Sequence, residues 1–118
     1  MTTVLLIVQD APYGSERPFN ALRLAAALQK ADPPAHVRLS LLSDAVTLAL
    51  RDQLRPDGQY NLETMLREFL DAGGEAKACS VCVDHRGLFR LKLVEGVTIG
   101  SMSELANWVL TSDRVIAF

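Results

Sequence analysis

Two cysteines, Cys79 and Cys82, are separated by two residues and are the side chains best suited to chemistry in this sequence. The thiolate is the nucleophilic form of cysteine. The start of a helix stabilises a thiolate through its free N–H groups and its partial positive charge, which contributes about 0.3–1 kcal/mol at an exposed site. We expect Cys79 to lie where a strand ends and a helical turn begins, and we therefore predict that it is a reactive nucleophile.

The spacing of the two cysteines leaves several chemistries open. In sulfur transfer, Cys79 attacks a sulfane-sulfur donor, holds the sulfur as a persulfide (Cys–S–SH) and passes it on. In dithiol redox chemistry, Cys82 attacks an adduct on Cys79 and forms a disulfide. In a third alternative both cysteines are packing residues, because cysteine is among the most buried residue types.

A zinc site is the remaining alternative for this segment. Cys79, Cys82 and His85, with Asp84 nearby, provide metal-binding side chains at short spacing. Zinc usually takes four ligands from two separated pairs, and the chain has no second Cys/His pair. We therefore expect neither a metal nor another cofactor.

Five further residues are candidates for a pocket around the cysteines. In a parallel α/β sheet, ligands bind outside the carboxyl ends of the strands. The side chains expected at that rim are Tyr13, Gly14, Ser15, Asp44 and Arg86. Arg86 would attract an anionic sulfur species. The competing interpretations are a capped turn for the 10–17 loop, a helix cap for Asp44 and a surface ion pair for Arg86.

The elements that must position these side chains alternate between strands and helices. Apolar runs predict strands, and apolar residues three and four apart predict helices. We predict strands over residues 4–8, 37–42, 75–78 and 113–118, helices over 15–30, 43–51, 61–72 and from 101 onward, and an extra extended segment over 88–93.

Capping signals mark where the helices begin. We expect caps at Ser15, at Ser43 or Asp44, and at Asn61. Ser101 is the first residue of a Ser-x-x-Glu capping box. The expected core stripe of the last helix consists of Met102, Leu105, Ala106 and Val109.

Strands that are apolar throughout are typical of a parallel sheet covered on both faces. The expected fold is a three-layer α/β/α sandwich with a mostly parallel sheet of about five strands, in one domain over residues 1–118. Apolar side chains outside the core stripes favour burial in a symmetric partner. These side chains are Phe89, Leu91, Leu93 and Trp108.

The composition narrows the possible partners. The chain has 12 basic and 14 acidic side chains, for a net charge of −2, whereas phosphate binding needs a basic surplus. It has no apolar run of about 20 residues and no secretory signal. We therefore expect no nucleic-acid partner, no membrane partner and a cytoplasmic location, where a stable structural disulfide is uncommon.

The sequence resembles the DsrE-like sulfur-relay proteins, and within them the small YchN-type branch. The resemblance covers nearly the whole chain. The matching segments are 11–16, 19–25, 42–46, 60–61, 79–87, 94–100, 104–108 and 113–115.

The resemblance implies a parallel α/β/α sandwich and assembly into trimers or hexamers. In the relay members one cysteine after the third strand carries a persulfide, and that position corresponds to Cys79. In the TusD-type relay subunit the position of Cys82 is not cysteine, so redox or metal chemistry stays open beside sulfur transfer. The resemblance also implies sulfur-donor and sulfur-acceptor proteins as partners. The competing hypothesis is an oligomeric binding module in which both cysteines are structural.

Overall fold

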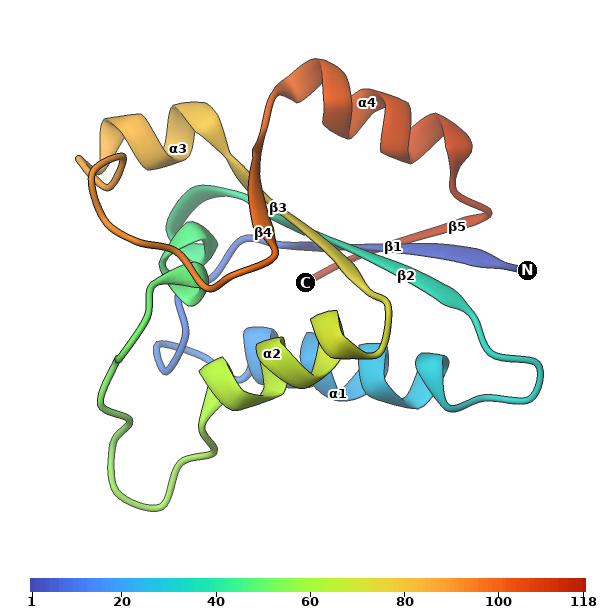
Figure 1. Cartoon of the computed structure of the whole chain (residues 1–118), viewed down its shortest axis with the longest axis horizontal. Coiled ribbons are helices and arrows are strands. Elements are labelled where there is room, and N and C mark those ends of the chain that lie inside the picture. The colour runs from blue at the N-terminus through green and yellow to red at the C-terminus, as the bar shows by residue number, and fades with distance from the viewer.

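Five parallel strands form a single sheet at the centre of the protein (Figure 1). The computed structural model describes all residues from 1 to 118. The strands are β1 (Thr3–Val8), β2 (His36–Leu41), β3 (Glu75–Cys79), β4 (Val97–Gly100) and β5 (Arg114–Ala117). Their order across the sheet is β4-β3-β2-β1-β5, and all four neighbouring pairs are parallel.

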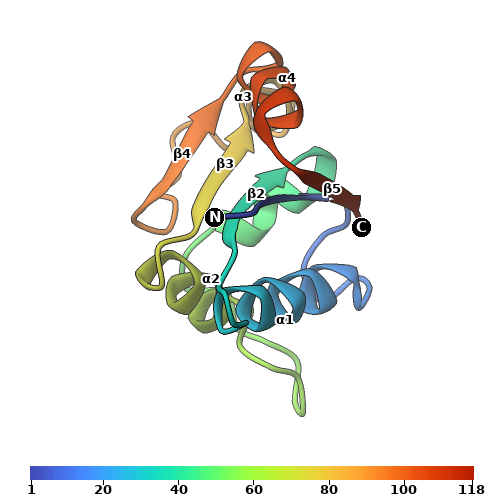
Figure 2. The same cartoon turned by 90° about the vertical axis from the view of Figure 1, so that its right-hand side faces the viewer.

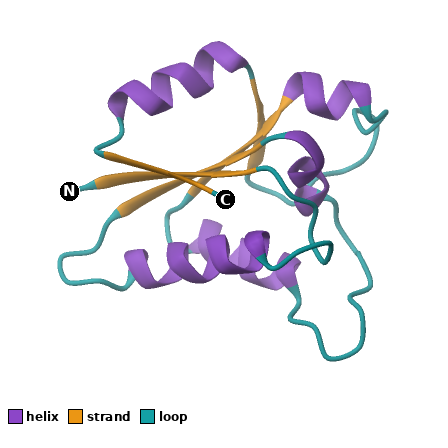
Figure 3. Cartoon of the chain, turned by 180° about the vertical axis from the view of Figure 1, so that it is seen from behind, coloured by secondary structure: helices purple, strands orange, loops and turns teal.

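Helices cover both faces of this sheet. The α-helices are α1 (Arg17–Gln29), α2 (Leu62–Asp71), α3 (Ser80–His85) and α4 (Met102–Thr111), and a 3₁₀ helix η1 spans Ser43–Ala49. Helices α1 and α2 lie on one face and α3 and α4 on the other (Figures 1 and 2). The same layers are visible from behind (Figure 3). The predicted three-layer α/β/α sandwich is confirmed, with five strands that are all parallel.

The central strands are apolar because both of their faces are covered. Leu5, Leu6 and Val8 of β1 are fully buried, as are Leu39 and Leu41 of β2. Each fully buried side chain of this type contributes about 1.5–3 kcal/mol relative to an exposed one. This core fixes the positions of the strand ends, from which the candidate site is built. None of the helices has both the length and the apolar character needed to cross a membrane.

Two of the expected caps are confirmed. The Asn61 side chain accepts a hydrogen bond from the Thr64 N–H at 3.1 Å, and α2 follows directly. Ser101 and Glu104 form the reciprocal capping box that begins α4. These polar side chains satisfy N–H groups that the helices cannot pair internally.

The other expected caps are wrong. Helix α1 begins at Arg17, with no side-chain cap, because Ser15 lies in the preceding turn. There the Ser15 hydroxyl donates to Asp10 at 2.7 Å and accepts from the Arg17 N–H at 3.2 Å. The segment 43–49 is a 3₁₀ helix whose N-cap is Leu42, and no side chain caps it.

Strand β4 replaces the extended segment predicted over 88–93. Residues 88–93 form turns and bends, with one isolated bridge between Leu93 and Leu50. Strand β4 has only four residues and lies at the edge of the sheet, where Thr98 and Ile99 are exposed. It is too short and too exposed to give the continuous apolar pattern that marks the central strands.

The predicted core stripe of α4 is also wrong. Trp108 is the one buried residue of this helix, while Met102, Ala106 and Val109 are exposed and Leu105 is half-buried. A single large ring fills the space between α4 and the sheet, so the smaller apolar side chains stay outside. Trp108 is consequently not available as an interface residue.

Candidate functional site

Cys79 is the last residue of β3 and the N-cap of α3. Its sulfur accepts a hydrogen bond from the Cys82 backbone N–H at 3.4 Å. The expected position at the junction of a strand and a helical turn is therefore confirmed. Cys79 is half-buried and packs against the edge of the hydrophobic core.

Cys82 lies one turn later, against the start of η1. Its sulfur accepts a hydrogen bond from the Ser43 backbone N–H at 3.2 Å. Burial raises the pKa of the Cys82 thiol and the neighbouring Cys79 thiol adds to the rise, while the Ser43 N–H and the charge of Arg86 oppose it. Both cysteines are free thiols, and Cys82 stays protonated at neutral pH.

Asp44 and Arg86 form an ion pair beside Cys82. The Arg86 guanidinium donates to Asp44 Oδ1 at 2.8 and 3.0 Å and to the Cys82 carbonyl at 3.2 Å. Asp44 therefore does not cap a helix. Its carboxylate holds Arg86 at the end of α3 and offsets the charge that an incoming anion would meet.

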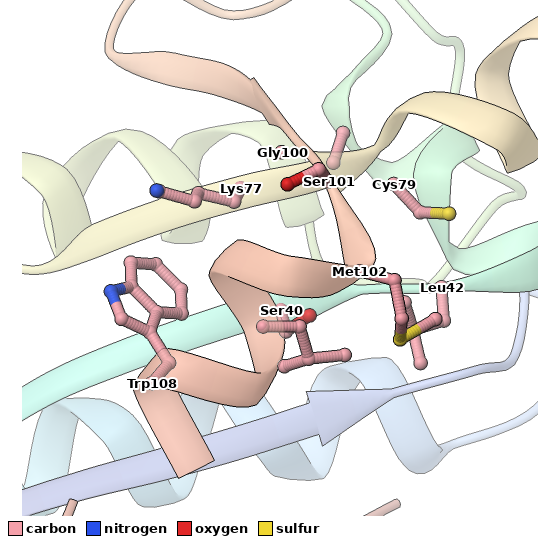
Figure 4. Close-up of a pocket in the computed structure, with 10 residues that line it drawn as sticks. Ser40, Leu42, Lys77, Cys79, Gly100, Ser101, Met102 and Trp108 are labelled. Carbon is pink, nitrogen blue, oxygen red and sulfur yellow. The ribbon is translucent and has the colours of Figure 1, made fainter. Parts of the chain in front are cut away.

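A narrow cavity, with room for about one water-sized molecule, lies between the sheet and α4 next to Cys79 (Figure 4). Cys79 lies at one end of the labelled side chains, and Lys77 and Trp108 lie at the other. The remaining lining residues are Ser40, Leu42, Ala78, Gly100, Ser101, Met102 and Leu105. Cys82 does not line this cavity, so a molecule inside it contacts Cys79 and not Cys82.

Lys77 is the basic residue of the cavity. Its ammonium pairs with Glu104 and lies 5.0 Å from the centre of the Trp108 ring. The Arg38 guanidinium lies 5.6 Å from the same ring. The hydrogen bond from Lys77, together with the capping N–H of Ser101, holds the pKa of Glu104 below its usual value. The Lys77 ammonium is therefore held in place by Trp108 and Glu104, and its positive charge is paired with the Glu104 carboxylate.

Sequence reasoning missed the α4 side of this cavity. Gly100 pairs with Cys79 in the β3–β4 register, which places the start of α4 beside the cysteine. The available signal was the Ser101 capping box, because it marks a helix that begins at the same rim of the sheet. We did not predict strand β4 from the sequence, so its pairing with β3, and the position of α4 beside Cys79, could not be foreseen.

Tyr13, Gly14 and Ser15 belong to another part of the rim. Tyr13 and Ser15 line a separate cavity with side chains of α1 and of the loop before α2. The Tyr13 hydroxyl accepts from the Leu62 N–H at 3.0 Å, and the Gly14 N–H donates to the Ala11 carbonyl at 3.3 Å. None of these three residues shares a cavity or a hydrogen bond with either cysteine.

No three His, Cys, Asp or Glu side chains come close enough together to hold a metal ion. His85 is exposed at the end of α3. His36, the other histidine, pairs with Glu75 at 2.5 Å at the opposite ends of the strands. The structure therefore does not bring Cys79, Cys82 and His85 together as a set of three metal ligands.

Comparison with known proteins relates this arrangement to one family. The sequence matches the DsrE/DsrF-like family over residues 2–118. It is 43% identical to protein YchN of Escherichia coli over 118 residues, which cover all of both chains. It is also 38% identical to an uncharacterized protein of Methanopyrus kandleri over 116 residues, covering 98% of this chain and 93% of the relative.

Solved structures give the same relationship. The crystal structure of YchN from Escherichia coli superimposes with a TM-score of 0.93 and covers 100% of both chains. A protein of unknown function from Methanobacterium thermoautotrophicum superimposes with a TM-score of 0.79 at 17% identity, again over 100% of both chains. At that identity the second match shows the fold alone.

Proposed function

The chain belongs to the DsrE/DsrF-like family, and we propose that it carries sulfur as a persulfide on Cys79. Family membership suggests sulfur relay. The observation that carries the proposal is the Cys79 sulfur, which caps α3 and borders a cavity at the carboxyl end of the sheet. This is where α/β proteins bind their ligands.

The proposed loading reaction is a thiol exchange with a small persulfide R–S–SH. The Cys79 thiolate attacks the terminal sulfur, the S–S bond of the donor breaks, and the thiolate R–S⁻ leaves. The product is Cys79–S–SH. An acceptor thiolate then takes the outer sulfur by the same exchange and restores the Cys79 thiolate.

Two features favour Cys79 over Cys82 as the carrier. Cys79 lines the cavity and Cys82 does not. In addition, burial raises the pKa of the Cys82 thiol, which lowers its fraction of nucleophilic thiolate at neutral pH. Sulfur therefore loads on the first cysteine of the pair.

The proposed carrier works in the cytoplasm with sulfur-donor and sulfur-acceptor proteins. Free thiols at the site suit the reducing cytoplasm. Donor and acceptor proteins would approach the open rim that carries Cys79. We also propose that the chain associates with copies of itself, because large apolar side chains of α4 and β5 are exposed.

Single-cysteine variants test the carrier directly. We expect Cys82→Ser, which keeps only Cys79, to gain one sulfur atom in intact mass after incubation with glutathione persulfide. We expect Cys79→Ser, which keeps only Cys82, to gain none at neutral pH. Equal uptake by the two variants, or no uptake by Cys82→Ser, contradicts the proposed function.

A further inference from the structure

We propose that Cys82 discharges the Cys79 persulfide by attacking the Cys79 sulfur, which releases hydrosulfide and leaves a Cys79–Cys82 disulfide. This inference rests on the proposed function, because it starts from the loaded carrier. It assigns a second reactive role to the site and makes hydrosulfide one of its products.

The backbone places Cys82 against the inner sulfur of the persulfide. The inner sulfur is Cys79 Sγ, which accepts the Cys82 N–H at 3.4 Å. The thiol of Cys82 also lies close enough to Cys79 to affect its own ionisation. Cys82 is thus positioned to attack the inner sulfur rather than to collect the outer one.

The cavity provides room for the leaving group. Cys79 borders the cavity, whereas the Cys82 sulfur is held on the η1 side by the Ser43 N–H. The outer sulfur of a persulfide would lie at the Cys79 end of this narrow cavity, which has room for about one water-sized group. Displacement at sulfur proceeds in line, with the nucleophile and the leaving group on opposite sides. Hydrosulfide can therefore leave through the cavity as Cys82 approaches from the other side.

The surroundings of Cys82 support negative charge during the attack. The Ser43 N–H donates to its sulfur at 3.2 Å, and Ser43 holds this position with a φ of 52°, in the left-handed region. The Arg86 guanidinium is anchored by Asp44 and donates to the Cys82 carbonyl at 3.2 Å.

The step balances without an external oxidant. A persulfide anion, Cys79–S–S⁻, and the neutral thiol of Cys82 give Cys79–S–S–Cys82 and HS⁻. The S–S bond to the outer sulfur breaks, the bond between the cysteines forms, and the Cys82 proton moves to the leaving sulfur. The outer sulfur is reduced to sulfide while the two thiols are oxidised. A dithiol reductant then supplies two electrons and two protons to restore the pair.

The discharge sets a lifetime for the carried sulfur. An acceptor that arrives quickly takes the sulfur from Cys79, and without an acceptor the site releases it as hydrosulfide. Because Cys82 is mostly protonated at neutral pH, transfer to an acceptor can compete with the discharge.

The test follows the persulfide after loading. Wild type, Cys82→Ser and Cys82→Ala are loaded with glutathione persulfide and freed of donor, and intact mass and trapped sulfide are then measured over time. We expect wild type to lose the sulfur at least about tenfold faster than either variant, because an attack within one molecule has a high effective concentration. We also expect one sulfide for each disulfide formed, at a rate independent of protein concentration.

The variants separate this inference from the proposed function. Serine keeps an oxygen that can accept the Ser43 N–H, and melting curves of both variants serve as the check that they fold. If neither variant takes up sulfur, the carrier function itself fails. If both take it up and lose it as fast as wild type, or if wild type releases sulfide without forming a disulfide, only the discharge by Cys82 is overturned.

Discussion

The two thiols are three residues apart, but their surroundings give them different chemistry. Both residues are half-buried, but Cys79 ends a strand and borders a cavity, whereas the Cys82 sulfur lies against the Ser43 backbone. The position of Cys79 was predictable, because the short strand predicted over 75–78 leads directly into the cysteine segment. The partner of Cys82 was not, because it comes from a segment 39 residues away.

The raised pKa of Cys82 predicts a distinct pH profile for its alkylation. In Cys79→Ser, burial remains as the main cause of the shift. We expect the iodoacetamide rate constant at neutral pH to be below that of an exposed cysteine peptide, and to keep rising above the pH where the peptide levels off. A profile that levels off at the same pH as the peptide contradicts the burial that we assign to Cys82.

Glu104 links the cavity to the stability of the fold. Its pKa is lowered in the folded protein by Lys77 first and by the Ser101 N–H second. A lowered folded pKa stabilises the protein above the unfolded carboxyl pKa, and this contribution is lost as the pH falls through the folded pKa. We therefore expect Glu104→Gln to melt at a lower temperature than wild type at pH 7.

The pH dependence of that difference is the control. Glutamine preserves the capping box but cannot pair with Lys77 as an anion. The gap between the two melting temperatures should shrink as the pH falls below the ordinary carboxyl value of 4.5. If the difference in melting temperature between wild type and Glu104→Gln stays the same in acid, the lower stability of the variant comes from packing and not from charge.

Among the elements, the long central strands and the capped helices were predictable and the edge strand was not. Strand β1 and helix α2 both have strong apolar patterns. Helix α2 also begins at a recognisable cap, Asn61. Strand β4 has four residues and two of them are exposed, so its pairing with β3 decides its structure. The alternation over 88–93 reflects side chains in turns, where period two carries no information about strands.

The absence of a side chain at Gly100 of β4 leaves room for Lys77, which lines the cavity. A Cβ at this position would lie 3.0 Å from Lys77 Cδ and 3.1 Å from Lys77 Cβ. We expect Gly100→Ala to displace Lys77 from the Trp108 ring and to cost about 1–3 kcal/mol of unfolding free energy. Fluorescence reports the change directly, since Trp108 is the only tryptophan.

Gly14→Ala is the matched control. The added Cβ would lie 3.5 Å from the Ala11 carbonyl oxygen, an ordinary contact. Its emission spectrum and its denaturation midpoint should match those of wild type. If Gly100→Ala behaves like this control, the close packing of Lys77 against β4 is wrong.

For the whole molecule, the alternating elements were enough to predict the layers of the fold. The sequence could not show which apolar side chains remain outside, because that depends on how α4 packs on the sheet. Burial of Trp108 leaves Met102, Leu110, Val115 and Ile116 exposed on α4 and β5. Phe89 and Leu91, which we expected at an interface, are also exposed.

This exposed surface predicts self-association. Leu110 is 84% exposed on α4. We expect light scattering to give wild type a mass that is a multiple of the 12.9 kDa chain, and Leu110→Glu to lower that mass. Leu54→Glu, at a residue that is 96% exposed in the loop before α2, should leave the mass unchanged. A wild-type mass of one chain contradicts the prediction.

The carrier role of Cys79 is tested most directly by locating the sulfur on the wild-type protein. The protein is exposed briefly to glutathione persulfide, alkylated at once and digested, and the peptide that contains both cysteines is sequenced by tandem mass spectrometry. We predict that the additional sulfur is found on Cys79. An additional sulfur on Cys82, or none on this peptide, would contradict the assignment of Cys79 as the sulfur carrier.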